Sequence, residues 1–317
     1  MGLVAAALGL ALFAWFIQRI GAALIWEGIR DVGWGFIVIV GIAGLRFGLR
    51  ALAWSTCLEP PASLAFSHAF GAVLAGDALG NLTPLGLIAS EPTKAAFVRS
   101  RIPLGTAVTA LAIENILYTL SVAAMIAAST VALLSSFELP SGMRIVSIIA
   151  VLAICVGFLI VVWLVWRRPA LVSRVLSMIV PKTSHLQSRV AQLRDVEDQV
   201  YSFARKRPWT LLRVAALETA FHALGVLEVY VTWWLMQGTP PSLLIAFILE
   251  GSARFIIVAF KFMPLQPGVA EWTTGYLTQL LGYGTAVGGT LSIVRKVRTV
   301  FWVLIGTILH VRRGVAR

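Results

Sequence analysis

The chain alternates long apolar segments with short polar ones. A helix rises about 1.5 Å per residue, so roughly 20 apolar residues are enough to cross the hydrocarbon core of a bilayer. Six segments reach this length: 3–25, 34–58, 105–134, 143–166, 208–236 and 285–310. The period-2 alternation of barrel strands is absent, and helices satisfy their own backbone hydrogen bonds within a bilayer. The pattern therefore predicts an all-α polytopic membrane protein with six spanning helices.

Two further apolar segments, 64–82 and 243–262, end at breaks that contain proline and glycine. A short polar helix is expected after each break, over 91–99 and 271–281, and Ser90 is the predicted N-cap of the first. Neither short helix is long enough to span a bilayer. The pattern predicts two re-entrant helix-break-helix hairpins, while the alternative is that the breaks are only kinks in ordinary spans.

The two hairpins belong to a longer repeat. Three landmarks of the first half recur in the same order about 180 residues later: Pro84 with Leu85, Glu91, and the GTAV run at 105–108 are matched by Pro264 with Leu265, Glu271, and the GTAV run at 284–287. We therefore expect residues 1–317 to form a single transmembrane domain. Its parts are a first repeat unit at 34–134, an amphipathic linker at 167–207 and a second unit at 208–310.

The distribution of Lys and Arg predicts the orientation. The linker 167–207 carries nine of them, and Arg312, Arg313 and Arg317 follow the last span, so both regions should be cytoplasmic. Counting spans from the linker places both termini in the cytoplasm. The first hairpin then enters from the cytoplasmic side and the second from the outside, which makes the repeat inverted. The turn at 59–61 has no basic residue of its own, so Arg46 and Arg50 are expected to extend to that face.

The linker has apolar residues at three- and four-residue steps, a spacing typical of an amphipathic helix. They are Leu186, Val190, Leu193, Val196, Val200 and Phe203. The pattern predicts a helix that lies on the bundle or on the membrane surface, and a regulatory or partner-binding arm is the alternative.

Composition excludes several classes of function. The net charge is +12, but Lys and Arg gather in loops, where they attract anionic headgroups, so nucleic acid is not an expected partner. No Walker motif and no nucleophile motif is present, so we expect neither ATP-driven transport by this chain nor an enzyme, and no cofactor. Glu218 and His222 have the i,i+4 spacing that metal sites use, but no third ligand is evident, so no metal is expected. Cys57 and Cys155 fall within or beside apolar segments and should be core residues.

Charged residues inside the apolar segments are the main functional signal. Arg295, Lys296 and Arg298 begin about ten residues into the last span, roughly 15 Å deep, where an isolated cation is costly. A phosphate headgroup would compensate them, because guanidinium groups bind phosphate through two parallel hydrogen bonds. An internal pair such as Glu250 with Arg254 is the structural alternative. The predicted substrate-binding residues are Asp77, Asn81, Glu91, Glu114, Arg254, Lys261, Glu271, Arg295 and Arg298.

Inverted repeats with interrupted helices are typical of transporters, in which two like halves exchange conformations around one site. We therefore expect the two breaks to approach each other near the bilayer centre and to line a polar cavity for an anionic lipid headgroup. Three other functions stay open. They are an enzyme that processes a lipid phosphate with Glu91, Glu218 and His222, an ion-coupled carrier of a small anion, and a structural subunit whose buried charges are all internally paired.

Several of these residues also resemble a known family. The first break with Asn81, Pro84, Gly86 and Glu91, the second break with Pro264, Pro267, Gly268 and Glu271, and the basic Arg295, Lys296 and Arg298 helix are similar to the lysylphosphatidylglycerol synthase transmembrane, or flippase-like, family. That resemblance implies a lipid translocase of the bacterial cytoplasmic (inner) membrane that moves an anionic, polyprenyl or hopanoid-type lipid.

The same resemblance makes Glu91, Glu271, Arg295 and Arg298 the first-choice functional residues. The chain ends seven residues after His310, so we expect no soluble aminoacyl-transfer domain and carry no lipid synthesis over. Membrane lipids with anionic headgroups are the expected partners, and a homo-oligomer or a lipid-biosynthesis partner stays open.

Overall fold

The computed structural model describes residues 30, 32–83, 86–167, 178, 187–260 and 268–315. These residues contain ten helices and no strand, which confirms the all-α prediction. The helix predicted at 3–25 lies outside the described residues, as do Lys261 and the proline and leucine landmarks at 84–85 and 264–265.

The helices follow the hydropathy pattern closely. They are α3 (Gly35–Thr56), α4 (Phe66–Leu82), α5 (Gly86–Val98), α6 (Leu104–Ser136), α7 (Ser141–Arg167), α9 (Gln187–Lys206), α10 (Pro208–Gln237), α11 (Leu243–Ala259), α12 (Val269–Leu280) and α13 (Thr285–Val315).

Four segments are long and apolar enough to cross a membrane: Gly35–Thr56, Leu104–Ser136, Ser141–Ile160 and Pro208–Gln237. The sixth predicted span corresponds to α13, which is 31 residues long. It carries Arg295, Lys296 and Arg298 in its middle, and these charges lower its hydropathy. The four apolar helices establish the chain as a multi-pass membrane protein.

Both predicted helix breaks are present. The first separates α4, which ends at Leu82, from α5, and the second separates α11 from α12. The expected start of the helix after the first break was wrong, because α5 begins at Gly86 and Ser90 lies inside it rather than at its N-cap. Pro92 is also inside α5. It cannot donate to the carbonyl of residue 88, but a single missing hydrogen bond does not end the helix here.

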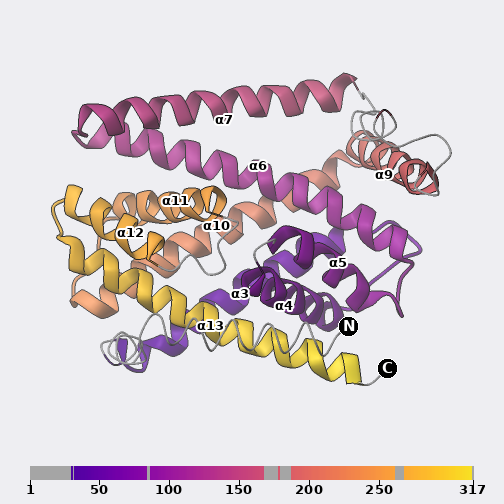
Figure 1. Ribbon diagram of the computed structural model, residues 1–317, viewed down its shortest axis with the longest axis horizontal. Helices are drawn as coiled ribbons and strands as arrows, with labels where there is room; N and C mark the ends of the chain where they lie inside the picture. The colour runs from indigo at the N-terminus through magenta and orange to yellow at the C-terminus, as the bar shows by residue number, and fades with distance from the viewer. Residues whose placement is uncertain are drawn as a thin grey trace.

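Helices from the first part of the chain contact helices from the last part in a matching pattern. The helices α3 and α10, which begin the two halves, contact each other in the centre of the molecule. The second helix of each half contacts the fourth helix of the other, so that α4 lies against α13 and α11 lies against α6. Figure 1 shows α13 running along the lower part of the bundle and α6 crossing above it, with α4, α5, α10, α11 and α12 between them and α7 above α6.

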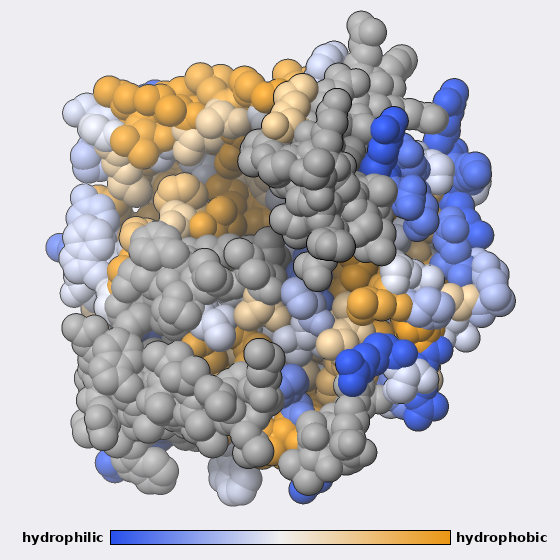
Figure 2. All heavy atoms as spheres, turned by 45° about the vertical axis from the view of Figure 1, so that its right-hand side comes forward, coloured by the Kyte–Doolittle hydropathy of each residue, from blue (hydrophilic) through white to orange (hydrophobic). Residues whose placement is uncertain are grey.

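Outside this core, α7 contacts α6, and none of its most apolar 18-residue window is buried. Hydrophobic side chains gather along the upper edge of the space-filling view, where α7 lies, and hydrophilic side chains gather at the right (Figure 2). An apolar helix with this exposure fits a surface that faces lipid. The amphipathic linker forms α9, as predicted, with Phe203 1% exposed and packed into the core beside Val200.

Glycines allow the two cross-half contacts. A Cβ at Gly306 of α13 would lie 2.2 Å from the carbonyl oxygen of Leu74 on α4, and a Cβ at Gly251 of α11 would lie 1.8 Å from Ser129 Oγ on α6. Small residues let membrane helices approach closely, which is where much of their packing energy arises. The same device therefore holds α4 to α13 and α11 to α6.

We expect Gly306→Val to force α13 away from α4 and to destabilise the fold by about 1–3 kcal/mol, as overpacking does. The matched control is Gly289→Val on the same helix, where a Cβ meets nothing within 4 Å. Thermal unfolding of both variants in detergent checks this expectation. Equal unfolding temperatures for the two variants would contradict the packing described.

Candidate functional site

A cavity between the two halves has a volume of about 350 Å³. This is within the range of about 300–1,000 Å³ that is common for small-ligand sites. Both interrupted hairpins line it: Asp77, Asn81 and Glu91 belong to the first, and Arg254 and Thr274 belong to the second. Helices that flank both breaks therefore line one shared cavity.

Cations dominate the wall of this cavity. Among the described residues, the wall carries seven cations and two carboxylates. The cations are Arg46, Arg50, Lys94, Arg254, Arg295, Lys296 and Arg298, and the carboxylates are Asp77 and Glu91. The carboxylates that balance most of the cations lie behind the wall, so the surface offered to a ligand is positive.

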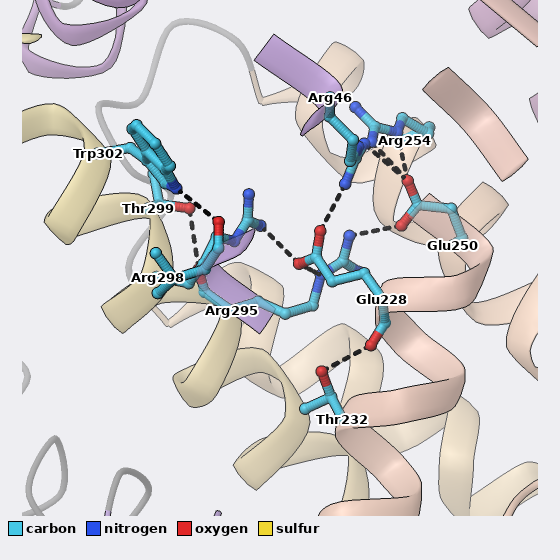
Figure 3. A network of polar contacts seen from close by, with 10 residues as sticks. Arg46, Glu228, Thr232, Glu250, Arg254, Arg295, Arg298, Thr299 and Trp302 are labelled. Atoms are coloured by element: carbon cyan, nitrogen blue, oxygen red, sulfur yellow. Dashed lines mark hydrogen bonds and ion pairs between the residues drawn. The ribbon is translucent and has the colours of Figure 1, made fainter. Parts of the chain in front are cut away.

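Two of these hidden carboxylates, Glu228 on α10 and Glu250 on α11, are completely buried. Glu228 accepts from Arg46 at 2.8 Å and pairs with Arg298 at 3.0 Å. Glu250 pairs with Arg254 and Arg295, each at 2.5 Å. Figure 3 shows these side chains converging from α3, α10, α11 and α13.

The arginines also share their partners. Arg46 reaches Glu250 at 3.2 Å in addition to Glu228, and Arg295 reaches Glu228 at 3.6 Å in addition to Glu250. Four guanidinium groups therefore surround two carboxylates, which leaves two positive charges in excess. Charge buried without compensation is strongly unfavourable, so this cluster is suited to an anion. We call Arg46, Glu228, Glu250, Arg254, Arg295 and Arg298 the arginine cluster.

Local packing explains how the arginine cluster fits between helices. A Cβ at position 225 would lie 2.3 Å from Glu250 Oε1, so Gly225 on α10 makes room for that carboxylate. The ring of Phe221, one turn earlier, carries the guanidinium groups of Arg46 at 4.5 Å and Arg254 at 5.0 Å. These cation–π contacts stabilise the cations without neutralising them.

Asp77 faces the arginine cluster from the other hairpin. Its Oδ2 accepts from Asn81 Nδ2 at 2.9 Å, one turn along α4. It interacts electrostatically with Lys94 and, less strongly, with Arg298 and Arg50, but no ion pair of Asp77 within 4 Å is present among the described residues. Asp77 is therefore placed to oppose a cation of the arginine cluster across the cavity rather than to neutralise it by contact.

A lysine–carboxylate pair lies beside each of the two hairpins. Lys94 donates to Glu91 at 2.7 Å, and Asn115 Nδ2 donates to the other oxygen of Glu91 at 2.8 Å. Lys296 donates to Glu271 in the second half. Glu271 also accepts from the backbone N–H of Gly268 at 2.8 Å and so caps α12. The two repeat-related glutamates thus each pair with a lysine, not with Arg295 or Arg298.

A third cluster lies behind Arg50. The Nε of Arg50 pairs with Glu114 Oε1 at 2.7 Å, and the guanidinium group of Arg50 lies over the ring of Tyr118, 3.6 Å from the ring centroid. Glu114 and Glu218 are each 1% exposed, and Glu218 also interacts electrostatically with Arg50. Arg50 is part of the cavity wall, whereas neither glutamate reaches it.

The structure brings most of the predicted substrate-binding residues together. Those that line the cavity are Asp77, Asn81, Glu91, Arg254, Arg295 and Arg298. Glu114 and Glu271 lie behind the wall and pair with lining cations, and Lys261 is outside the described residues.

The expectation for Arg46 and Arg50 was wrong, because both point into the bundle and pair with buried carboxylates instead of extending to the turn at 59–61. The predicted set also omitted Lys94 and Lys296. Charge within an apolar segment was the signal that could have found Arg46, Arg50 and Lys296, whereas Lys94 lies in the short polar helix and carries no such signal.

The site offers few groups for chemistry. Among the described residues, no group of three or more His, Cys, Asp or Glu is placed to hold a metal ion. Of the three residues suggested for an enzyme, only Glu91 lines the cavity, while Glu218 and His222 do not.

We expect Glu250→Gln to destabilise the protein strongly, because it leaves three arginines of the cluster with reduced compensation. Breaking a buried ion pair from one side typically costs about 3–5 kcal/mol. Arg295→Gln is the matched comparison, since both carboxylates keep other arginine partners. The unfolding temperature in detergent should decrease more for Glu250→Gln than for Arg295→Gln. The opposite order would contradict the excess of positive charge in the arginine cluster.

Comparison with curated proteins returned no match, and neither did comparison with solved structures. One family matches, and the match covers residues 2–306, almost the whole chain. The chain belongs to the family of the lysylphosphatidylglycerol synthase TM region.

Proposed function

We propose that the protein is a translocator of lipids with anionic headgroups, which pass through the cavity between the two hairpins while the acyl or isoprenoid tails remain in the bilayer. One observation carries this proposal: four arginines in the wall of a cavity that both hairpins line share two fully buried carboxylates behind that wall. Membership of a lipid-related membrane family agrees with it.

The excess charge suits a ligand that arrives and leaves. A permanent structural role would need one carboxylate for each cation, whereas the arginine cluster has half that number. A phosphate headgroup would supply the missing negative charge and would accept paired hydrogen bonds from Arg295 and Arg298. On its departure, the arginines would again share Glu228 and Glu250.

Movement across the membrane would come from exchange between the two halves. The packing of α4 on α13 and of α11 on α6 supports an inverted repeat, because each contact becomes the other when the halves are exchanged. In such a design, one half rocks against the other around a fixed central site. Glu91 and Glu271 are related by the 180-residue offset of the repeat, whereas their partners Lys94 on α5 and Lys296 on α13 are not. The two pairs would close the path from opposite sides.

Two other functions fit the geometry less well. In a structural subunit the buried charges should all be internally paired. Each arginine of the cluster does have a carboxylate partner, but the four arginines share only two carboxylates, so the pairing does not balance their charge. A lipid-phosphate enzyme would need Glu91, Glu218 and His222 at one place, and only Glu91 is at the cavity. A carrier of small soluble anions uses the same charge chemistry, so a transport assay must separate it from a lipid translocator.

Arg295→Ala should abolish transfer of a fluorescent phosphatidylglycerol between the leaflets of proteoliposomes, because the headgroup loses a guanidinium partner. Transfer is measured as the fraction of label that an impermeant quencher reaches. Arg298→Lys should slow transfer at least tenfold, since an ammonium group cannot make the paired contact. Both variants should fold, because Glu228 and Glu250 keep other arginines.

The control is Arg144→Ala, which removes an exposed cation at the start of α7 and should transfer lipid at the normal rate. Normal transfer by Arg295→Ala would show that the arginine cluster is structural. Uptake of a soluble phosphate ester in place of the lipid would favour the small-anion carrier.

The proposed orientation places residues 167–207 and the C-terminal end in the cytoplasm of a bacterial cell, with the protein in the inner membrane. Ser188→Cys, on a background with Cys155→Ser, should resist an impermeant maleimide in intact cells and react in inverted vesicles. Labelling from outside intact cells would reverse the orientation and, with it, the sides from which the two hairpins enter.

A further inference from the structure

A buried pair of carboxyl groups lies directly behind the cavity, on the side of Arg50. Glu114 on α6 and Glu218 on α10 are each 1% exposed, and their carboxyl groups interact electrostatically with each other and with Arg50. Among the described residues, no N–H or hydroxyl group donates a hydrogen bond to either oxygen of Glu218. Two facing carboxylates cannot hydrogen-bond to each other unless one of them carries a proton.

The charges in and around this pair sum to a net negative charge, whereas those of the arginine cluster sum to a net positive charge. Arg50 is the cation in contact with Glu114, and it also interacts with Glu218. The other ionisable groups that interact with the pair are Cys57 from α3, Lys94 from α5 and Tyr118 from α6. One further polar group lies one turn from Glu218: the Nε2 of His222 is 3.0 Å from Ser121 Oγ.

One guanidinium between two carboxylates leaves one negative charge in excess. Like charges that share a buried site do not both ionise, and the pair then holds a proton between its two oxygens. That proton also supplies the hydrogen bond that Glu218 otherwise lacks. The arginine cluster therefore needs an anion to balance its charge. The Glu114–Glu218 pair beside it needs a proton.

Arg50 connects the two sites, because its guanidinium lines the cavity while its Nε contacts Glu114. We propose that Glu114 and Glu218 form a proton-binding site that couples headgroup binding to proton uptake through Arg50. This inference rests on the proposed function. At rest the pair holds one proton; when a phosphate in the cavity attracts Arg50, the remaining carboxylate loses its cation and takes one more proton from solution.

The resting proton can be tested without any lipid. The infrared spectrum of the wild-type protein at neutral pH should contain the carbonyl stretch of a protonated carboxyl group, and Glu218→Gln should remove it. Glu114→Gln is the second variant and should remove the same band if Glu218→Gln does not fold. Glu138→Gln, at an exposed carboxylate between α6 and α7, should leave the spectrum unchanged. No difference between wild type and either pair variant would overturn the proposal.

The coupling is tested by binding of a short-chain phosphatidylglycerol, whose phosphodiester does not titrate near neutral pH. If one proton is taken up with each lipid anion, the affinity of the wild type for the lipid should increase about tenfold for each pH unit of decrease between about pH 8 and pH 6. Arg144→Ala should keep this dependence. The double variant Glu114→Gln with Glu218→Gln should lose it, because no carboxylate is left to take up the proton.

Different results would contradict the two proposals, lipid translocation and its coupling to proton uptake. If the carbonyl band is present but the lipid binds at no pH, the translocator proposal fails and the resting proton site stands. If the wild type binds the lipid equally well at both pH values, the coupling is overturned, although lipid translocation stands.

Discussion

Compensation of charge inside an apolar helical bundle is the constraint on which this structure depends. Four arginines from α3, α11 and α13 are held in the interior by two fully buried carboxylates on α10 and α11. These ion pairs join helices from both halves of the chain, so the contacts that stabilise the bundle also shape its cavity. Because the compensation is incomplete, the site that holds the protein together is also the proposed binding site for an anion.

The close packing around the cavity follows from the same requirement. Gly225 gives Glu250 room between α10 and α11, and Gly251 and Gly306 bring the two halves together where α11 meets α6 and α13 meets α4. Without these close approaches, the long side chains of the arginine cluster could not reach shared partners. Small residues and large charged ones are therefore two parts of one arrangement.

The sequence predicted the helices well, because hydropathy and proline or glycine breaks report on bilayer thickness and local backbone geometry. The bounds of α3, α6, α7 and α10 lie within a few residues of the predicted spans. The start of α5 was predicted wrongly, since Ser90 has the chemistry of an N-cap although it lies inside a helix that continues through Pro92. Capping preferences describe helix ends but do not by themselves locate them.

The candidate site was predictable only in part. The depth of Arg295 and Arg298 along the last span indicated a polar site, and the i,i+4 pair of Glu250 with Arg254 was visible in the sequence. The partners of Arg46 were not, because Glu228 and Glu250 lie 182 and 204 residues away along the chain. Only the three-dimensional arrangement reveals that four cations share two anions, and only that count distinguishes a binding site from a structural one.

The central claim is that this imbalance binds an anionic headgroup. A cryo-electron microscopy map of the protein in nanodiscs rich in phosphatidylglycerol tests it most directly. The account predicts phosphate density inside the cavity, in contact with Arg295 and Arg298. Lipid density confined to the outer surface, with the four arginines still sharing Glu228 and Glu250 around an empty cavity, would contradict it.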